Sequence, residues 1–306
     1  MSLEIVDLSV VFHRAGRQPV PAVVNVNLRV DPGRLTGLVG ESGSGKSSLG
    51  RAAVGIYKPT AGILHIDQKV FEPSDGARLG YLPEERGLYQ KESVLDVMVY
   101  FGRLKGLSRK KAEDWSHAYL ERVALTDKAA TRVDKLSGGQ QQKIQLGVTI
   151  MNDPELLILD EPTQGFDPVN RRLLMDIIED QKRAGATVIM VTHQMEEVER
   201  LCDRVLLLKD GTAEAYGTVE DVQDSYGGTI IRVQYSGPLP ASDLYDITSV
   251  DHDHAQLAPR AGTDEADILR ELVQRGVAVR SFTTSRTSLE EIFLKVYGNQ
   301  NEPVGA

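Results

Sequence analysis

The sequence contains one cysteine, Cys202, among its 306 residues. A single thiol excludes an internal disulfide bond and is typical of a protein in a reducing compartment. Cys202 lies in a helical pattern, and we expect it to be a small buried residue without chemistry of its own.

Long apolar runs are also missing, because no stretch approaches the roughly 18 residues of a membrane-spanning helix. Residues 1–6 lack a basic region followed by a hydrophobic signal core. We therefore expect no signal peptide and no insertion into a membrane. A formal net charge of -9 argues against a nucleic-acid partner, since that surface needs clustered Lys and Arg, but it does not exclude docking to a membrane protein.

A glycine-rich turn organises the rest of the chain. It follows the apolar run Leu35–Val39 and precedes a helix expected at 49–56. Its residues match the phosphate loop of an NTPase: Gly40, Glu41, Ser42, Gly43, Ser44, Gly45, Lys46, Ser47 and Ser48. The glycines let backbone N–H groups converge on a polyphosphate, Lys46 can reach the β- and γ-phosphates, and the Ser47 hydroxyl can ligate Mg²⁺. A glycine-rich turn with a chance lysine is the alternative.

A second anion-binding terminus is predicted at residues 136–140, which read Leu-Ser-Gly-Gly-Gln and open another helix. Ser137 can cap this helix, while the neighbouring Gly138 and Gly139 offer bare N–H groups. Taken alone, the pattern is also compatible with a simple N-cap.

Two carboxylates, Asp160 and Glu161, end a strand expected at 156–159. At the carboxyl edge of a parallel sheet they sit beside the phosphate loop, where Asp160 can hold Mg²⁺ through water and Glu161 can polarise an attacking water. His193 follows another strand and is placed to contact the γ-phosphate. A solvated turn and a structural histidine are the respective alternatives.

Two further features are weaker. Phe12 ends the first expected strand and could stack on an adenine ring, although an ordinary aromatic residue at a strand end explains it equally well. After a boundary at 224–228 we expect a small unit of strands and two helices with no catalytic constellation. His252 and His254 lie among aspartates there, and we favour a solvated turn over a weak metal site.

Five elements occur in one order: residues 40–47, the loop at Glu84, residues 136–140, the pair Asp160-Glu161, and His193. In this order and spacing they resemble the ATP-binding cassette (ABC) family over residues 1 to about 220. Residues 82–89 and 288–293 are similar to the bacterial sodium- and drug-efflux exporter ATPases, which carry a small C-terminal domain.

The resemblance implies an α/β fold of the P-loop NTPase ABC type. Its nucleotide-binding domain, expected over 1–223, has a mixed sheet core, an antiparallel β subdomain and a helical subdomain at about 91–150. A small α+β C-terminal domain is expected over 228–306.

The resemblance also implies an ATPase with ATP and Mg²⁺ as cofactors. Two cassettes are expected to close head to tail, so that Ser137, Gly138, Gly139 and Gln140 of one chain face the nucleotide on the other. Glu161 acts as general base, and Lys46 and His193 neutralise charge. The closing pair is expected to be a homodimer, with a different cassette as the alternative partner, and it drives a separate transmembrane permease at the cytoplasmic side of the cell membrane. A regulatory or soluble ABC protein switched by ATP is the alternative.

The sequence departs from the family pattern twice. Glu84 stands where the family usually has Gln; as a Mg²⁺ ligand it adds negative charge near the γ-phosphate, and we expect altered metal or coupling behaviour. Residues 164–167 read Gln-Gly-Phe-Asp where Ser-Gly-Leu-Asp is common, but Asp167, the expected contact across the dimer, is retained.

Overall fold

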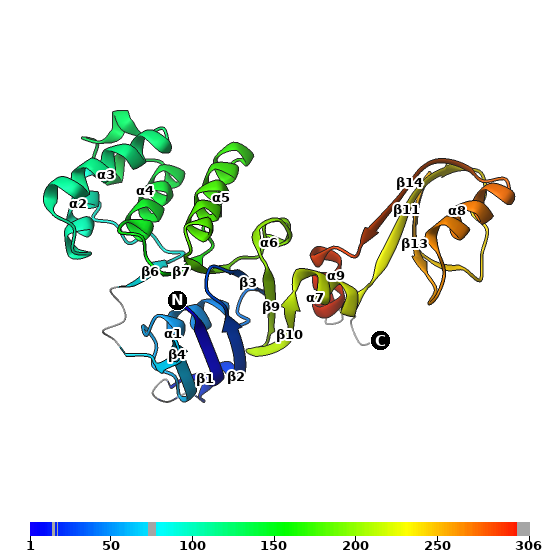
Figure 1. Ribbon diagram of the computed structural model, residues 1–306, viewed down its shortest axis with the longest axis horizontal. Coiled ribbons are helices and arrows are strands. Elements are labelled where there is room, and N and C mark those ends of the chain that lie inside the picture. The colour runs from blue at the N-terminus through cyan, green and yellow to red at the C-terminus, as the bar shows by residue number, and fades with distance from the viewer. Residues whose placement is uncertain (14–15, 17, 73–77, 299–306) are drawn as a thin grey trace. The chain divides into compact units, whose positions relative to one another are not determined.

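The computed structural model describes residues 1–13, 16, 18–72 and 78–298, and its chain divides into two compact units, Met1–Thr218 and Val219–Ala306 (Figure 1). The second unit begins with α7 (Val219–Tyr226), which packs against α9 (Leu289–Gly298) of the same unit. The two units meet before α7, whereas the boundary expected at 224–228 falls at the end of this helix. Residues 299–306 of the expected C-terminal domain lie outside the described residues.

The first unit is built on a six-stranded sheet in the order β10-β9-β3-β8-β7-β6. Its strands are β3 (Leu35–Val39), β6 (Leu79–Leu82), β7 (Leu156–Asp160), β8 (Thr187–Val191), β9 (Arg204–Lys209) and β10 (Thr212–Thr218). All neighbours are parallel except β10, which pairs antiparallel with β9. The strands β3, β7 and β8 are buried along their whole length, which explains their continuous apolar runs.

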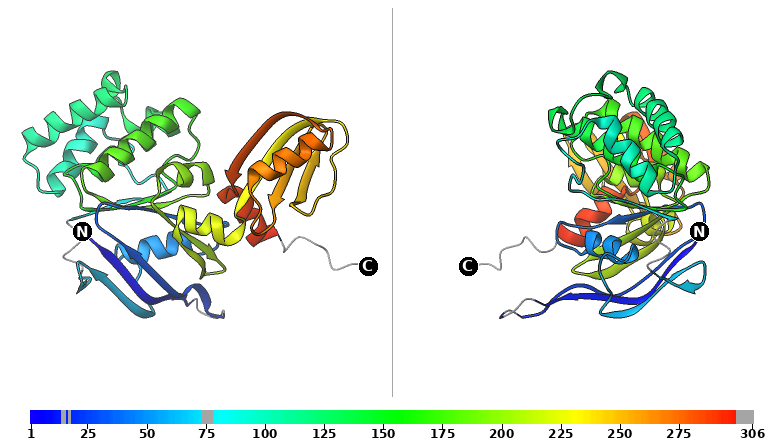
Figure 2. Two further views of the ribbon diagram at one scale, coloured as in Figure 1. Left: turned by 45° about the vertical axis from the view of Figure 1, so that its right-hand side comes forward. Right: turned by 90° about the vertical axis from the view of Figure 1, so that its left-hand side faces the viewer.

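A second, antiparallel sheet in the order β2-β1-β4-β5 packs beside the first. It consists of β1 (Leu3–Phe12), β2 (Val20–Val30), β4 (Ala61–Ile66) and β5 (Lys69–Val70). Helix α1 (Lys46–Ala53) contacts strands of both sheets and lies between them (Figure 2). Its buried residues Leu49, Ala52 and Ala53 join the two sheets in one core cluster. The predicted mixed sheet and antiparallel β subdomain are thus confirmed.

Three helices, α2 (Val94–Leu104), α3 (Arg109–Arg122) and α4 (Gly138–Ile150), pack side by side (Figure 1). Ser93 and Ser108 cap α2 and α3 by accepting a hydrogen bond from the backbone N–H three residues on. Between α3 and α4, the Tyr119 hydroxyl donates to the carbonyl oxygen of Lys143 at 2.7 Å. Helices α5 (Pro168–Arg183) and α6 (Met195–Leu201) connect the later strands of the parallel sheet.

The second unit contains an antiparallel sheet in the order β12-β13-β11-β14. Its elements are β11 (Thr229–Ser236), β12 (Tyr245–Asp251), β13 (His254–Pro259), α8 (Glu265–Gln274) and β14 (Ala278–Arg286). Helix α8 covers one face, where Ile268 and Leu272 pack on Val233 and Leu257. The part of the chain that the structure describes includes no helix long and apolar enough to cross a membrane.

Candidate nucleotide-binding site

The glycine-rich turn connects the end of β3 to the start of α1. Gly43 and Gly45 have φ angles of 86° and 100°, values that favour glycine. A Cβ atom on Gly45 would lie 2.0 Å from the carbonyl oxygen of Ala22 in β2. The turn therefore passes so close to the antiparallel sheet that position 45 tolerates only glycine.

The Lys46 side chain is 8% exposed and folds beneath the turn. Its ammonium donates to the carbonyl oxygens of Gly40 at 2.8 Å and Glu41 at 2.7 Å. Burial lowers the pKa of Lys46, while the negative charges of Glu161 and Asp160 oppose that shift. A positive charge is thus held at the point where the turn and the carboxyl edge of the sheet meet.

Asp160, at the end of β7, lies beside the first turn of α1. Its Oδ1 accepts a hydrogen bond from the Ser47 hydroxyl at 3.1 Å, while its buried Oδ2 has no hydrogen-bond partner among the described residues. Burial raises the pKa of Asp160, and the nearby charge of Glu84 raises it further. The Ser47 hydroxyl and the carboxylates of Asp160 and Glu84 are hard oxygen donors of the kind that Mg²⁺ prefers. No group of three or more His, Cys, Asp and Glu side chains in the described residues could hold a metal, so an ion here would also need Ser47, water or phosphate oxygens.

Glu161 has a φ of 50°, which is unusual for a residue with a side chain. Its backbone N–H donates to the carbonyl oxygen of Val191 at 2.8 Å. Its Oε1 lies 2.9 Å from His193 Nδ1, and its buried Oε2 has no partner among the described residues. His193 Nε2 in turn lies 3.1 Å from Gln194 Nε2, so the histidine links the carboxylate to Gln194. The sequence did not predict this direct Glu161–His193 contact.

The segment at 136–140 forms the N-terminus of α4 through a capping box. The Ser137 hydroxyl accepts from the backbone N–H of Gln140 at 3.3 Å, and Gln140 Oε1 accepts from the backbone N–H of Ser137 at 2.9 Å. Gln140, expected among the nucleotide-binding residues, thus has its side-chain oxygen committed to the helix cap. Asp167 has a similar structural task, because its carboxylate caps α5 by accepting from Val169 and Asn170.

A hollow of 280 Å³ brings the start of α4 together with the ends of β6 and β7. It is lined by Glu84, Arg86, Gly138, Gly139, Gln142, Glu161, Gln164 and Gly165. Glu161 therefore lies close to both groups of predicted site residues. It lines this hollow with the α4 terminus, and its charge acts on Lys46 of the phosphate loop.

Phe12 packs edge-on against Tyr57, with ring centroids 5.2 Å apart. It is partly buried against the core between the sheets. This contact matches the structural alternative given for Phe12, and an adenine contact stays a prediction.

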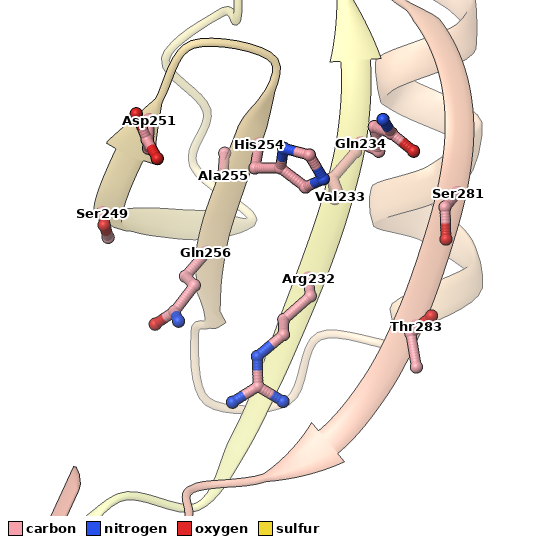
Figure 3. Close-up of a pocket in the computed structure, with 10 residues that line it drawn as sticks. All are labelled: Arg232, Val233, Gln234, Ser249, Asp251, His254, Ala255, Gln256, Ser281 and Thr283. Carbon is pink, nitrogen blue, oxygen red and sulfur yellow. The ribbon is translucent and has the colours of Figure 1, made fainter.

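The second unit has a polar hollow of 480 Å³ on one face of its sheet (Figure 3). His254 lies in it, with Nδ1 2.8 Å from Asp253 Oδ1, while His252 Nδ1 lies 2.7 Å from Asp251 Oδ1. Both imidazoles are exposed and paired with an adjacent aspartate; His252 lies in the expected turn, whereas His254 is the first residue of β13.

Sequence reasoning missed Glu197, a carboxylate on α6 that is 2% exposed. Its Oε2 accepts from the Thr163 hydroxyl at 2.8 Å, and its Oε1 lies 3.7 Å from Arg171 Nε. Thr163 is two residues after Glu161, so Glu197 fixes the chain just beyond the catalytic candidate. The sequence offered one signal: Glu197 is an acidic residue on the side of α6 that Val198 and Leu201 mark as buried.

Replacing Glu197 by Gln should make the stability of the protein less sensitive to pH. Burial raises the pKa of Glu197 above its ordinary value of 4.5. The folded state therefore binds the proton more tightly than the unfolded chain does. The resulting stability is fully present below about pH 4.5 and is lost as the pH rises through the raised pKa. In urea unfolding at about pH 5 and about pH 8, the free energy of unfolding should fall less for Glu197→Gln than for the wild type. Equal decreases would contradict this assignment.

The geometry defines a P-loop NTPase: a parallel sheet, a glycine turn at a helix start, and acidic residues at the neighbouring strand end. The family model described as ABC transporter matches residues 23–164, and the one described as ATP-binding protein DrrA1-3-like, C-terminal domain, matches residues 217–297.

Relatives match almost the whole chain. An ABC transporter ATP-binding protein of Alkalihalophilus pseudofirmus is 34% identical over 265 residues, which cover 85% of this chain and 98% of that protein. The Nod factor export ATP-binding protein I of Rhizobium etli is 31% identical over 310 residues, covering 99% and 96%. The chain belongs to the ABC family of transporter ATP-binding subunits and carries a DrrA-like C-terminal domain.

Solved structures support the fold. The ATP-binding subunit of an ABC transporter aligns with a TM-score of 0.66 at 26% identity, covering 74% of this chain and 93% of that one. A dimeric ATP-binding cassette in a post-hydrolysis state bound to ADP and Pi aligns with a TM-score of 0.65 at 24% identity, covering 71% and 98%. The expected fold class is therefore confirmed.

Proposed function

We propose that this protein is the ATPase subunit of an exporter, and that two copies close head to tail around ATP to drive a separate transmembrane permease. The observation that carries the proposal is the end of β7, which places Asp160 and Glu161 beside Lys46 and Ser47. One buried carboxylate oxygen of each acid has no hydrogen-bond partner among the described residues. Such acids beside a phosphate loop suit a metal-assisted phosphoryl transfer to water.

In this proposal the phosphate loop, Gly40 to Ser48, holds the phosphates through its backbone N–H groups and Lys46. The hydroxyl of Ser47 and the carboxylate of Glu84 would hold Mg²⁺, and Asp160 would support it through water. When bound, the ion neutralises phosphate charge. Phe12 lies against the adenine.

Glu161 accepts the proton of the attacking water, and His193 holds that carboxylate by the 2.9 Å contact. If Nδ1 carries the imidazole proton, His193 donates to Glu161 and leaves Nε2 as an acceptor from the Gln194 amide. This arrangement fixes the orientation of the base.

The second chain completes the site. Ser137, Gly138 and Gly139 at the positive end of α4 close over the γ-phosphate bound to the other chain, and Gln140 maintains the helix end by its cap. Asp167 orders the turn at the start of α5 beside the same interface.

Export is supported by a relative that matches nearly the full chain, the Nod factor export ATP-binding protein I of Rhizobium etli. A peripheral position on the cytoplasmic side of the membrane, held by that permease, follows from this proposal.

A mixing experiment tests the shared site. Lys46→Ala removes the phosphate contact of one chain, while Ser137→Asp keeps an N-cap residue but places a carboxylate against the γ-phosphate. Each variant alone should have almost no ATPase activity. In an equal mixture, half of the dimers contain one intact site, so about a quarter of the wild-type rate should return. As a control, Ser108→Asp changes another N-cap serine, at α3, and should not alter the rate. A mixture no more active than its components would contradict the head-to-tail arrangement.

A further inference from the structure

Arg86 lies directly on the N-terminus of α4. A Cβ atom on Gly138 would be only 2.4 Å from Arg86 Nη2 and 2.9 Å from its Cζ, so the guanidinium covers the first residue of the helix. Both residues line the 280 Å³ hollow. The absence of a side chain at Gly138 is what makes room for the guanidinium.

The charge of Arg86 is unpaired in the part of the chain that the structure describes. Within the described residues no carboxylate lies within ion-pair distance of it, whereas Arg78 and Arg132 pair with Glu155 and Asp134. A cation at the positive end of a helix is electrostatically disfavoured. The guanidinium and the helix N-terminus together create a concentrated positive potential that an anion would satisfy.

The loop that carries Arg86 is fixed to α4 on both sides. Upstream, the Gln145 amide of α4 donates to the carbonyl oxygens of Pro83 at 3.1 Å and Glu85 at 3.0 Å. Downstream, Leu88 is buried in the core that includes the three packed helices. Arg86 thus keeps its register with the α4 terminus and would move together with it.

An acidic partner within the same chain would be the simplest alternative. Glu161 lines the same hollow, but its Oε1 contacts His193 and its Oε2 has no partner among the described residues. The guanidinium is therefore available to a ligand that approaches the hollow from outside.

We propose that Arg86 is a further nucleotide-binding residue that acts across the dimer, contacting the γ-phosphate held by the phosphate loop of the second chain. This inference rests on the proposed head-to-tail function. A planar guanidinium can bind two phosphate oxygens at once, and its contact strengthens the closed pair only when ATP is present.

The first test measures how much ATP is needed to form the dimer. In the Glu161→Gln background, which retains ATP, Arg86→Gln should raise the ATP concentration for half-maximal dimerisation by roughly tenfold. Arg86→Lys should fall in between, because an ammonium keeps the charge but lacks the two-pronged geometry. Arg109→Gln, which removes an equal charge from the exposed start of α3, should have no effect. An Arg86→Gln value within about twofold of that control would overturn the proposal.

The second test decides between the two chains. Tagged Lys46→Ala chains retain Arg86 but cannot hold ATP themselves, so every dimer that they form uses the nucleotide of the untagged partner. Capture of untagged Arg86→Gln chains should require the same ATP concentration as capture of chains with Arg86 intact, with both partners in the Glu161→Gln background.

A tenfold higher requirement for the Arg86→Gln partner would overturn the assignment across the dimer. Failure of the proposed function itself has a different signature. In that case chains with Arg86 intact would not dimerise at any ATP concentration.

Discussion

Glu161→Gln should reduce ATP turnover by about 10²- to 10⁴-fold while leaving ATP binding intact. The carboxamide has nearly the same shape as the carboxylate but cannot take a proton from water. Oε2 of Glu161 has no hydrogen-bond partner among the described residues, so this oxygen is not committed to another side chain. Phosphate release at saturating ATP and Mg²⁺ measures the loss, and the nucleotide recovered from the protein shows retention of ATP.

The matched control is Glu155→Gln, which makes the same chemical change just before the opposite end of the same strand. Glu155 pairs with Arg78 at an exposed position, so its loss should have little effect on stability or rate. A Glu161→Gln rate within about tenfold of the wild type would show that another group accepts the proton.

Gly45→Ala should weaken nucleotide binding strongly through a steric effect. The new Cβ atom would lie 2.0 Å from the Ala22 carbonyl oxygen, so the turn must move away from β2. A displacement of about 1 Å in a positioned group can cost roughly 100-fold, and we expect ATP affinity to fall by about that factor. Calorimetric titration with ATP measures it.

Gly185→Ala separates this overlap from backbone strain. Gly185 has the same φ of 100°, but a Cβ atom there would meet nothing within 4 Å. Both substitutions carry the strain of a positive φ, about 1–2 kcal/mol, but only Gly45→Ala adds the overlap. Gly185→Ala should therefore bind ATP normally and melt a few degrees lower. Normal ATP affinity in Gly45→Ala would contradict the steric account.

The fold and the phosphate loop were predictable because their signals are local. Buried parallel strands appear as continuous apolar runs, and the carboxyl ends of such strands meet at one edge. That rule places Asp160 and Glu161 beside Lys46. The structure shows this proximity as the Ser47–Asp160 hydrogen bond, and the negative charge of Glu161 opposes the lowering of the Lys46 pKa.

The features that sequence reasoning missed depend on contacts between distant segments. Glu197 meets Thr163 across 34 positions, and no local pattern encodes that pair. Arg86 reaches Gly138 only because Gln145 holds its loop on α4.

Two helix caps had recognisable sequence patterns, but their residues were predicted to bind the nucleotide or to act across the dimer. Ser137 and Gln140 have the spacing of a capping box, and Asp167 before Pro168 has that of a helix N-cap. These structural roles account for the residues in one chain, whereas the expected contacts across the dimer stay predictions.

The mass of the Glu161→Gln chain in solution tests the central claim most directly, because the proposal makes dimerisation a consequence of ATP binding. By light scattering, the chain of 33.6 kDa should be a monomer without nucleotide, should reach about twice that mass with ATP and Mg²⁺, and should return to the monomer with ADP. A mass that stays monomeric when equilibrium dialysis shows bound ATP would contradict a site completed by a second chain.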